Sequence, residues 1–188
     1  MSLDVFLFFL LIKSKNFKFV LACKLVYTMI YYYILIEREN DMIYLGADHR
    51  GYGLKEKIKK YFESQNVEFK DYGTYSTEVT HYPLIASKVC TDMDVEKDRA
   101  ILICGSGIGM SMVANKFKGI RAGICSSVMS AEDGKQHSDL NVLVLAGDFI
   151  TKDDAIEIIK VWQNAEFLNG RYLERLEMIK EIEEKNMK

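Results

Sequence analysis

The sequence predicts an α/β fold: a doubly wound (Rossmann-like) five-stranded parallel sheet, in three αβα layers, with a C-terminal helix. From residue 42 onward, short apolar runs alternate with segments in which apolar residues recur at helical spacing. One run, 100–103, is continuously apolar, as expected of a strand that helices cover on both faces. Strands that alternate with helices form parallel βαβ units, and such units build a doubly wound sheet.

Five apolar runs are the expected strands, and the segments between and after them contain the expected helices. The strands are predicted at 43–47, 67–72, 100–103, 120–124 and 142–145. The helices are predicted at 54–64, 83–93, from the glycine-rich stretch after residue 104 to about residue 117, from 151 to 169–170, and from 171 onward. Twelve glycines and one proline leave little room for a linker, so residues 42–188 are expected to form one domain.

Residues 1–41 differ in composition from the rest and are predicted to be an apolar extension. A secretory signal is disfavoured because lysines follow the first apolar run, 5–12, instead of preceding it. The favoured interpretation is a mis-set translation start, since these are residues that AT-rich DNA encodes, and a purine-rich stretch precedes the Met42 codon on back-translation. A membrane anchor, for which the run 19–36 is long enough, and a disordered or soluble extension remain alternatives.

Composition and charge limit the classes of function. Of the 188 residues, 49% are hydrophobic and 28% are charged, the balance of a globular protein with a sizeable core. The formal net charge of -2 gives no general electrostatic reason to expect binding to nucleic acid or to an anionic membrane. The four cysteines form no CxxC pair and have no Cys/His spacing typical of zinc, so we expect reduced thiols in the cytoplasm and no metal site.

The chemistry is expected beyond the carboxyl ends of the strands, where doubly wound sheets bind their ligands. Asp48 and His49 follow the first strand, and Cys104 with the loop Gly105-Ser106-Gly107-Ile108-Gly109 follows the third. Glycines let backbone N–H groups converge on an anion, and the start of a helix favours the thiolate form of a neighbouring cysteine. The loop therefore predicts a reactive thiol beside an anion site. A dinucleotide site is disfavoured because the spacing is GxGxG and not GxGxxG.

Three further residues are weaker candidates. His137 lies in a polar stretch immediately before the fifth strand, an unusual place for a packing histidine. Arg171 and Arg175 are four residues apart and so share one helix face, as two guanidinium groups that hold a phosphate would. An ordinary charged helix surface explains that spacing equally well, and a solvated loop is the alternative explanation for the charges around His49.

Several dispersed motifs resemble the ribose-5-phosphate isomerase B family, which also contains the galactose-6-phosphate isomerase subunits. The resemblance covers residues 42–182 in order, and nothing before Met42 takes part in it. It is carried by GADHRGYGLK at 46–55, DYGTYS at 71–76, Tyr82-Pro83, ICGSGIGMS at 103–111, ANK at 114–116, GIRA at 119–122 and Gly170 to Arg175.

The resemblance implies aldose–ketose isomerisation through an enediolate, without metal or cofactor, in a homodimer or a tetramer whose active sites lie between subunits. It implies that Cys104 moves a proton between C1 and C2 and that His137 opens the furanose ring. It also implies that His49, with the two arginines, holds the phosphate. The full set it implies is catalytic Cys104, His137, Ser106 and Asp48, and substrate-binding His49, Tyr82, Gly105, Gly107, Ile108, Gly109, Met110, Ser138, Arg171 and Arg175.

Three residues depart from the pattern of that family. Ser106 replaces the more usual threonine and keeps the hydroxyl, and Ser138 stands where an asparagine often follows the histidine. Asp148 stands where relatives often carry an additional arginine, and a carboxylate there would not help to bind phosphate. The departures affect the choice of substrate and leave the proton-transfer residues intact.

The leading hypothesis is an isomerase of carbohydrate metabolism that interconverts ribose 5-phosphate and ribulose 5-phosphate, as in the pentose phosphate pathway. One alternative is the same chemistry on a six-carbon substrate such as allose or galactose 6-phosphate. Another is a non-catalytic module that binds a nucleotide or a sugar phosphate. The expected partners are a small sugar phosphate and a second copy of the chain, with no nucleic acid, and no membrane unless residues 1–41 are genuine.

Overall fold

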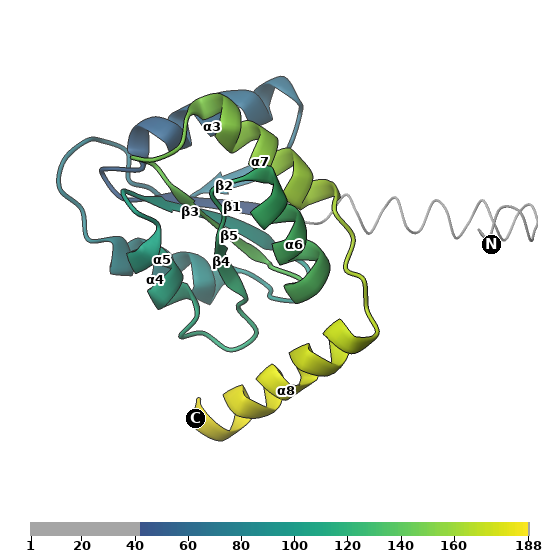
Figure 1. The fold of residues 1–188 in the computed structure, drawn as a ribbon. Coiled ribbons are helices and arrows are strands. Elements are labelled where there is room, and N and C mark those ends of the chain that lie inside the picture. Colours follow the sequence, from purple (N-terminus) through teal and green to yellow (C-terminus); the bar gives the residue numbers. More distant parts are fainter. Residues whose placement is uncertain (1–41, 188) are drawn as a thin grey trace, which may run out of the picture. The chain divides into compact units, whose positions relative to one another are not determined.

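The structure, a computed structural model, describes residues 42–187 and confirms the predicted fold class (Figure 1). Five parallel strands form one sheet in the order β2-β1-β3-β5-β4. The chain starts near the centre and winds outward on both sides, so the switch point lies between β1 and β3. The strands are β1 (Ile43–Ala47), β2 (Phe69–Asp71), β3 (Arg99–Cys104), β4 (Ala122–Ile124) and β5 (Val142–Ala146).

Helices cover both faces of this sheet and form the outer layers (Figure 1). One face is covered by α3 (Tyr52–Ser64), α6 (Val128–Ser138) and α7 (Lys152–Asn164). The other face is covered by α4 (Tyr82–Asp92) and α5 (Ile108–Ala114). The last helix, α8 (Arg171–Asn186), follows the coil 165–170 and lies beside α6.

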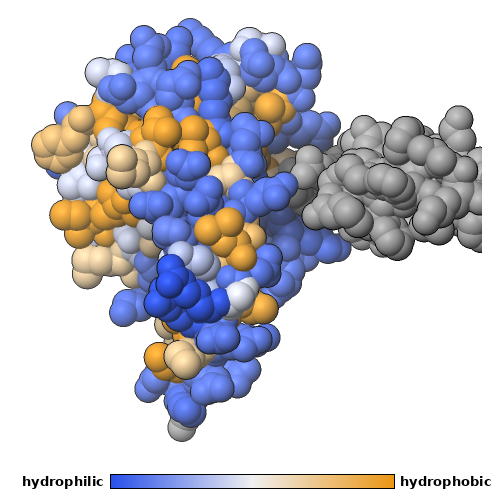
Figure 2. Space-filling model, turned by 45° about the vertical axis from the view of Figure 1, so that its right-hand side comes forward, coloured by the Kyte–Doolittle hydropathy of each residue, from blue (hydrophilic) through white to orange (hydrophobic). Residues whose placement is uncertain are grey.

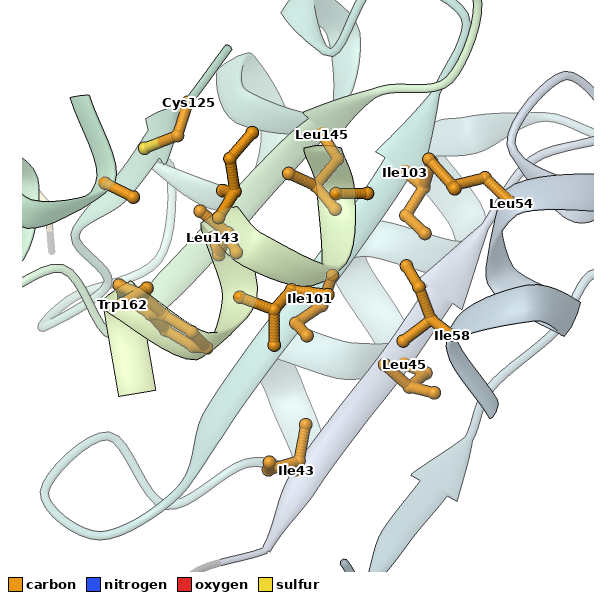
Figure 3. Packing of buried hydrophobic residues seen from close by; sticks show 14 of the residues in the cluster. Ile43, Leu45, Leu54, Ile58, Ile101, Ile103, Cys125, Leu143, Leu145 and Trp162 are labelled. Carbon is orange, nitrogen blue, oxygen red and sulfur yellow. The ribbon is translucent and has the colours of Figure 1, made fainter. Parts of the chain in front are cut away.

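The core consists of two apolar clusters, one on each face of the sheet. In β3, Ile101 and Ile103 point toward α3, α6 and α7, where Trp162 is also fully buried (Figure 3). Leu102 and Cys104 point to the opposite face, under α4 and α5. Successive side chains of a strand face opposite sides, and full burial of both sets explains the uninterrupted apolar run in the sequence.

The predicted strands 67–72 and 120–124 are shorter in the structure, at Phe69–Asp71 and Ala122–Ile124, and the helix predicted to about residue 117 ends at Ala114. Two further features differ more strongly from the predicted elements. The helix α6 was not among them, because Ala131 is its one buried residue and it therefore lacks an apolar stripe. Its start is fixed instead by a reciprocal capping box between Ser127 and Ser130. In addition, α7 ends at Asn164 and not at 169–170, since the backbone of Ala165 is extended (φ -69°, ψ 141°).

The helix α8 carries apolar side chains that the other residues of the described part of the chain leave exposed. None of its residues is buried, and Leu173, Ile179 and Ile182 are 43%, 45% and 57% exposed. Figure 2 shows apolar side chains exposed at the lower end of the molecule, where α8 lies. One contact back to the domain is the hydrogen bond from the Gly119 N–H to the Glu183 carboxylate, at 3.0 Å.

The predicted extension, residues 1–41, lies outside the described residues. The described part begins at Met42, whose carbonyl accepts a hydrogen bond from the Arg99 N–H at 3.0 Å, directly before β1. Among residues 42–187, no helix combines the length and the hydropathy needed to cross a membrane.

Candidate active site

The loop that follows β3 places one backbone N–H against the Cys104 thiol. Cys104 is the last residue of the strand, and α5 begins at Ile108. The Gly107 N–H donates to Cys104 Sγ at 3.2 Å, and the Ile108 N–H points to Ser106 Oγ at 3.4 Å. Cys104 is 5% exposed, so this hydrogen bond acts on a sulfur that is shielded from water.

Glycine is required at two positions of this loop. Gly107 has φ +77°, in the left-handed region that other residues rarely adopt. Gly109 faces the Tyr82 ring, and a Cβ on it would lie 2.6 Å from two ring atoms. The missing side chain at Gly109 thus lets Tyr82, the first residue of α4, lie directly against the loop.

The end of β1 places Asp48 and His49 at the same edge of the sheet. Asp48 is 5% exposed, and its Oδ1 accepts from the N–H groups of Arg50 and Gly51 at 2.9 and 3.0 Å. Its own N–H donates to the Ile103 carbonyl at 3.1 Å, which joins this turn to the strand that carries Cys104. Asp48 therefore holds the turn that presents His49 to the edge.

The imidazole of His49 is fixed in one tautomer. The N–H of Thr80 donates to His49 Nδ1 at 3.2 Å, so that nitrogen is an acceptor and the ring proton lies on Nε2. Thr80 belongs to the segment between β2 and α4 that leads to Tyr82. An imidazole held in this way presents its Nε2–H as a donor for an anion.

The other sequence-predicted residues gather around Tyr172, a residue that the sequence analysis missed. The rings of His137 and Tyr172 stack with centroids 4.5 Å apart and planes 14° from parallel. The guanidinium carbons of Arg171 and Arg175 lie 4.9 and 5.7 Å from the Tyr172 ring. Asp133 Oδ1 is 3.8 Å from His137 Nδ1. Tyr172 thus joins the histidine to both arginines, and its position beside Arg171 in the sequence was the available signal.

Within one chain, this second group lies at the opposite edge of the sheet from Cys104. Cys104 pairs with Ala146 at the end of β5, whereas His137 is near the end of α6 and precedes the start of β5 at Val142. Four residues separate Val142 from Ala146, which is about 13 Å along a strand. The structure therefore brings Asp48, His49, Tyr82 and the Cys104 loop together, and it does not bring His137, Ser138, Arg171 or Arg175 to them.

The two other cysteines of the described domain are ordinary core residues. Burial raises the pKa of the Cys90 thiol to about 11. Burial also raises the pKa of Cys125 to about 11, against the lowering effect of a hydrogen bond with Ser130. Neither is a thiolate at neutral pH. Among residues 42–187, no three His, Cys, Asp or Glu side chains are grouped as a metal site would need.

The fold and the loop define a class of protein: a doubly wound α/β protein with a shielded, hydrogen-bonded thiol at the switch point. Within that class, residues 43–179 match the family model described as Ribose/Galactose Isomerase, which covers most of the chain. The chain belongs to this family.

Its relatives include proteins of known name and known structure. The ribose-5-phosphate isomerase B of Escherichia coli is 42% identical over 144 residues, which are 76% of this chain and 97% of that one. The structure of a ribose-5-phosphate isomerase B from Clostridium thermocellum is 39% identical in sequence and has a TM-score of 0.74. The match covers 77% of this chain and 98% of the Clostridium chain. The structure of a ribose-5-phosphate isomerase B from Mycoplasma genitalium with bound ribulose-5-phosphate is 34% identical and has a TM-score of 0.71. The match covers 78% of this chain and 99% of the Mycoplasma chain.

Proposed function

We propose that this protein is an aldose–ketose isomerase that interconverts ribose 5-phosphate and ribulose 5-phosphate. The observation that carries the proposal is the Cys104 thiol, hydrogen-bonded by the Gly107 N–H at the start of a glycine loop. Family membership supports the reaction class, and the names of the E. coli and M. genitalium relatives support the five-carbon substrate.

Cys104 acts as the base of the reaction. Its thiolate takes the proton from C2 of the open-chain sugar; the electrons of that C–H bond form the C1=C2 double bond, and the carbonyl electrons move to O1. The resulting enediolate receives the proton at C1, O2 becomes the new carbonyl oxygen, and the proton of O2 passes to O1. Ser106 and the N–H groups from Gly107 to Met110 stabilise the oxygen on which negative charge develops.

The remaining steps need residues from both edges of the sheet. His137 opens the ring by moving a proton between the anomeric hydroxyl and the ring oxygen, held by its stack on Tyr172. Asp48 and Tyr82 contact sugar hydroxyls, and His49 with Arg171 and Arg175 binds the phosphate. The further substrate contacts proposed are Gly105, Ile108, Gly109 and Ser138.

A homodimer explains how the Cys104 loop and the His137–Tyr172 group can share one site although they lie apart within one chain. A two-fold arrangement can place the His137–Tyr172 group of one subunit against the Cys104 loop of its partner, giving two equal sites. The uncovered apolar side chains of α8 support such an interface. Cytoplasmic location is part of the same proposal.

Residues 42–188 are proposed to be sufficient for folding and activity. The family match begins at residue 43, and the E. coli relative is covered over 97% of its length without residues 1–41. A truncated protein that starts at Met42 is expected to match the kcat/KM and Tm of the full chain. An inactive or unfolded truncated protein would contradict this part of the proposal.

A six-carbon sugar phosphate is the second candidate substrate. Ser138 and Asp148 depart from the family pattern at positions where substrate contacts are expected. These two departures are the reason to test a six-carbon substrate beside ribose 5-phosphate. Turnover of ribose, allose and galactose phosphates under equal conditions decides between them. The five-carbon proposal requires the highest kcat/KM with ribose 5-phosphate.

The test of the isomerase itself is Cys104→Ala with Cys125→Ala as the matched control. Both changes remove a buried thiol, but only the first removes the proposed base. We expect Cys104→Ala to lower kcat for ribose 5-phosphate by at least about 10³-fold while Cys125→Ala keeps most of it. Equal activity in the two variants would favour a binding module or a different base.

A further inference from the structure

An ion pair lies against the Cys104 loop. The guanidinium Nη2 of Arg50 pairs with Asp148 Oδ2. The same guanidinium lies against Gly105, in the space that a side chain at that position would occupy. Arg50 follows His49 at the end of β1, while Asp148 follows β5, so the pair bridges two strands across the loop.

The backbone around this pair is fixed to the loop. The Gly147 N–H donates to the Cys104 carbonyl at 2.8 Å, and the Asp148 N–H donates to the Gly105 carbonyl at 3.1 Å. The carboxylate therefore stands at a fixed place beside the loop, and it holds the arginine over Gly105.

Stability alone does not explain this arrangement. The Arg50 side chain is 57% exposed and the Asp148 side chain 32%, and exposed ion pairs contribute little to folding. A guanidinium has five N–H donors, and the hydrogen bond to Asp148 uses one nitrogen. Donors remain for a ligand that enters over the loop.

We propose that Arg50 is a further phosphate-binding residue of the isomerase site, oriented by Asp148. It follows His49 in the sequence, and the Nε2–H of that residue is the proposed neighbouring donor for the same anion. The Arg50 guanidinium would add a charge-assisted hydrogen bond to a second phosphate oxygen from the same subunit. Without Arg50, the carboxylate of Asp148 at this edge would repel the phosphate. The proposal rests on the proposed function for the identity of the anion.

The experiment separates binding of phosphate by Arg50 from mere neutralisation of Asp148. Inorganic phosphate is the probe, measured as a competitive inhibitor of ribose 5-phosphate turnover and, independently of activity, by the rise in Tm that it causes. The variants are Arg50→Gln and the double variant Arg50→Gln/Asp148→Asn, which leaves the net charge unchanged. The control is Lys152→Gln, which removes an exposed cation from the start of α7.

We expect both Arg50 variants to raise the Ki of phosphate about tenfold and to reduce its Tm shift, with kcat within about twofold. Lys152→Gln should behave as the unchanged protein. A double variant that binds phosphate as the unchanged protein does would overturn the proposal, as would a loss of kcat without a change in Ki. If the unchanged protein does not isomerise ribose 5-phosphate, the proposed function fails, and the Tm shift still tests Arg50.

Discussion

Replacing Asp71 with Asn should destabilise the domain because it leaves a buried ammonium group with only the more distant and more exposed carboxylate of Glu56, at 3.2 Å. Lys55 is fully buried, and its Nζ lies 2.6 and 2.5 Å from the two carboxylate oxygens of Asp71. Lys59 Nζ contacts the same carboxylate at 2.8 Å, and the Gly73 N–H donates to it at 3.0 Å. This one side chain therefore joins α3 to the end of β2 and to the segment that leads to Tyr82.

The magnitude follows from burial of the lysine. Removing one partner of a buried ion pair costs about 3–5 kcal/mol, because the remaining charge stays desolvated. Asp71 is 13% exposed at its side chain and Lys55 is 0% exposed, so solvent screens little of this cost. For a domain of this size, the loss corresponds to a fall in Tm of roughly 6–20 °C.

The assay is urea unfolding followed by circular dichroism, with Glu157→Gln as the control. Glu157 pairs with Lys160 on the exposed face of α7, at 2.7 Å, and that pair should contribute less than about 1 kcal/mol. An unfolding free energy for Asp71→Asn within 1 kcal/mol of the control would refute the reasoning. Such a result would mean that water or the Glu56 carboxylate compensates the Lys55 ammonium group when Asp71 is lost.

Three other predictions concern pH, the loop and the second subunit. Burial tends to raise the pKa of Asp71, but the hydrogen bonds from its lysines lower this pKa below the ordinary value. The stabilising effect of Asp71 is therefore present above about pH 4 and is lost as the pH falls further. The difference in unfolding free energy between the unchanged protein and Asp71→Asn should shrink in acid, and a constant difference would contradict this. Gly109→Ala should displace the Tyr82 ring and lower kcat/KM about tenfold. In a protein that already carries Tyr82→Ala, the Gly109→Ala change should cause no further loss of kcat/KM. Losses that add up in the double variant would show that Gly109→Ala does not act through the Tyr82 ring. We expect the Cys104→Ala chain and the His137→Ala chain each to be inactive alone. When the two are co-expressed in equal amounts, about a quarter of full activity should return, because about half of the dimers are mixed and each mixed dimer has one intact site of two. No activity in isolated mixed dimers would mean that both residues of a site come from one subunit.

The sequence predicted the sheet because its strands are covered on both faces. Each central strand then reads as an uninterrupted apolar run, as in 100–103, and the runs alternate with helical patterns. The same reasoning failed for α6, where burial of Ala131 alone leaves no apolar stripe, and for the end of α7, where the backbone of Ala165 turns extended before any sequence stop signal.

The site was predictable only in part. The rule that parallel strands end at one edge placed Asp48, His49 and Cys104 together. The same rule places His137, which precedes a strand, at the opposite edge of the sheet. A site that contains both Cys104 and His137 therefore needs a second chain, and the sequence of one chain gives no contacts between chains. The pairing of Arg50 with Asp148 joins residues 98 positions apart, and no local pattern signals it.

The most direct test of the central claim is isomerisation in D₂O followed by NMR. If the Cys104 thiolate carries the proton between C1 and C2, deuterium should appear at C1 of the ribulose 5-phosphate formed to the extent that the thiol exchanges with solvent during turnover. Both the turnover and the exchange should be lost in Cys104→Ala and kept in Cys125→Ala. Turnover or exchange that persists in Cys104→Ala would contradict a proton transfer through Cys104.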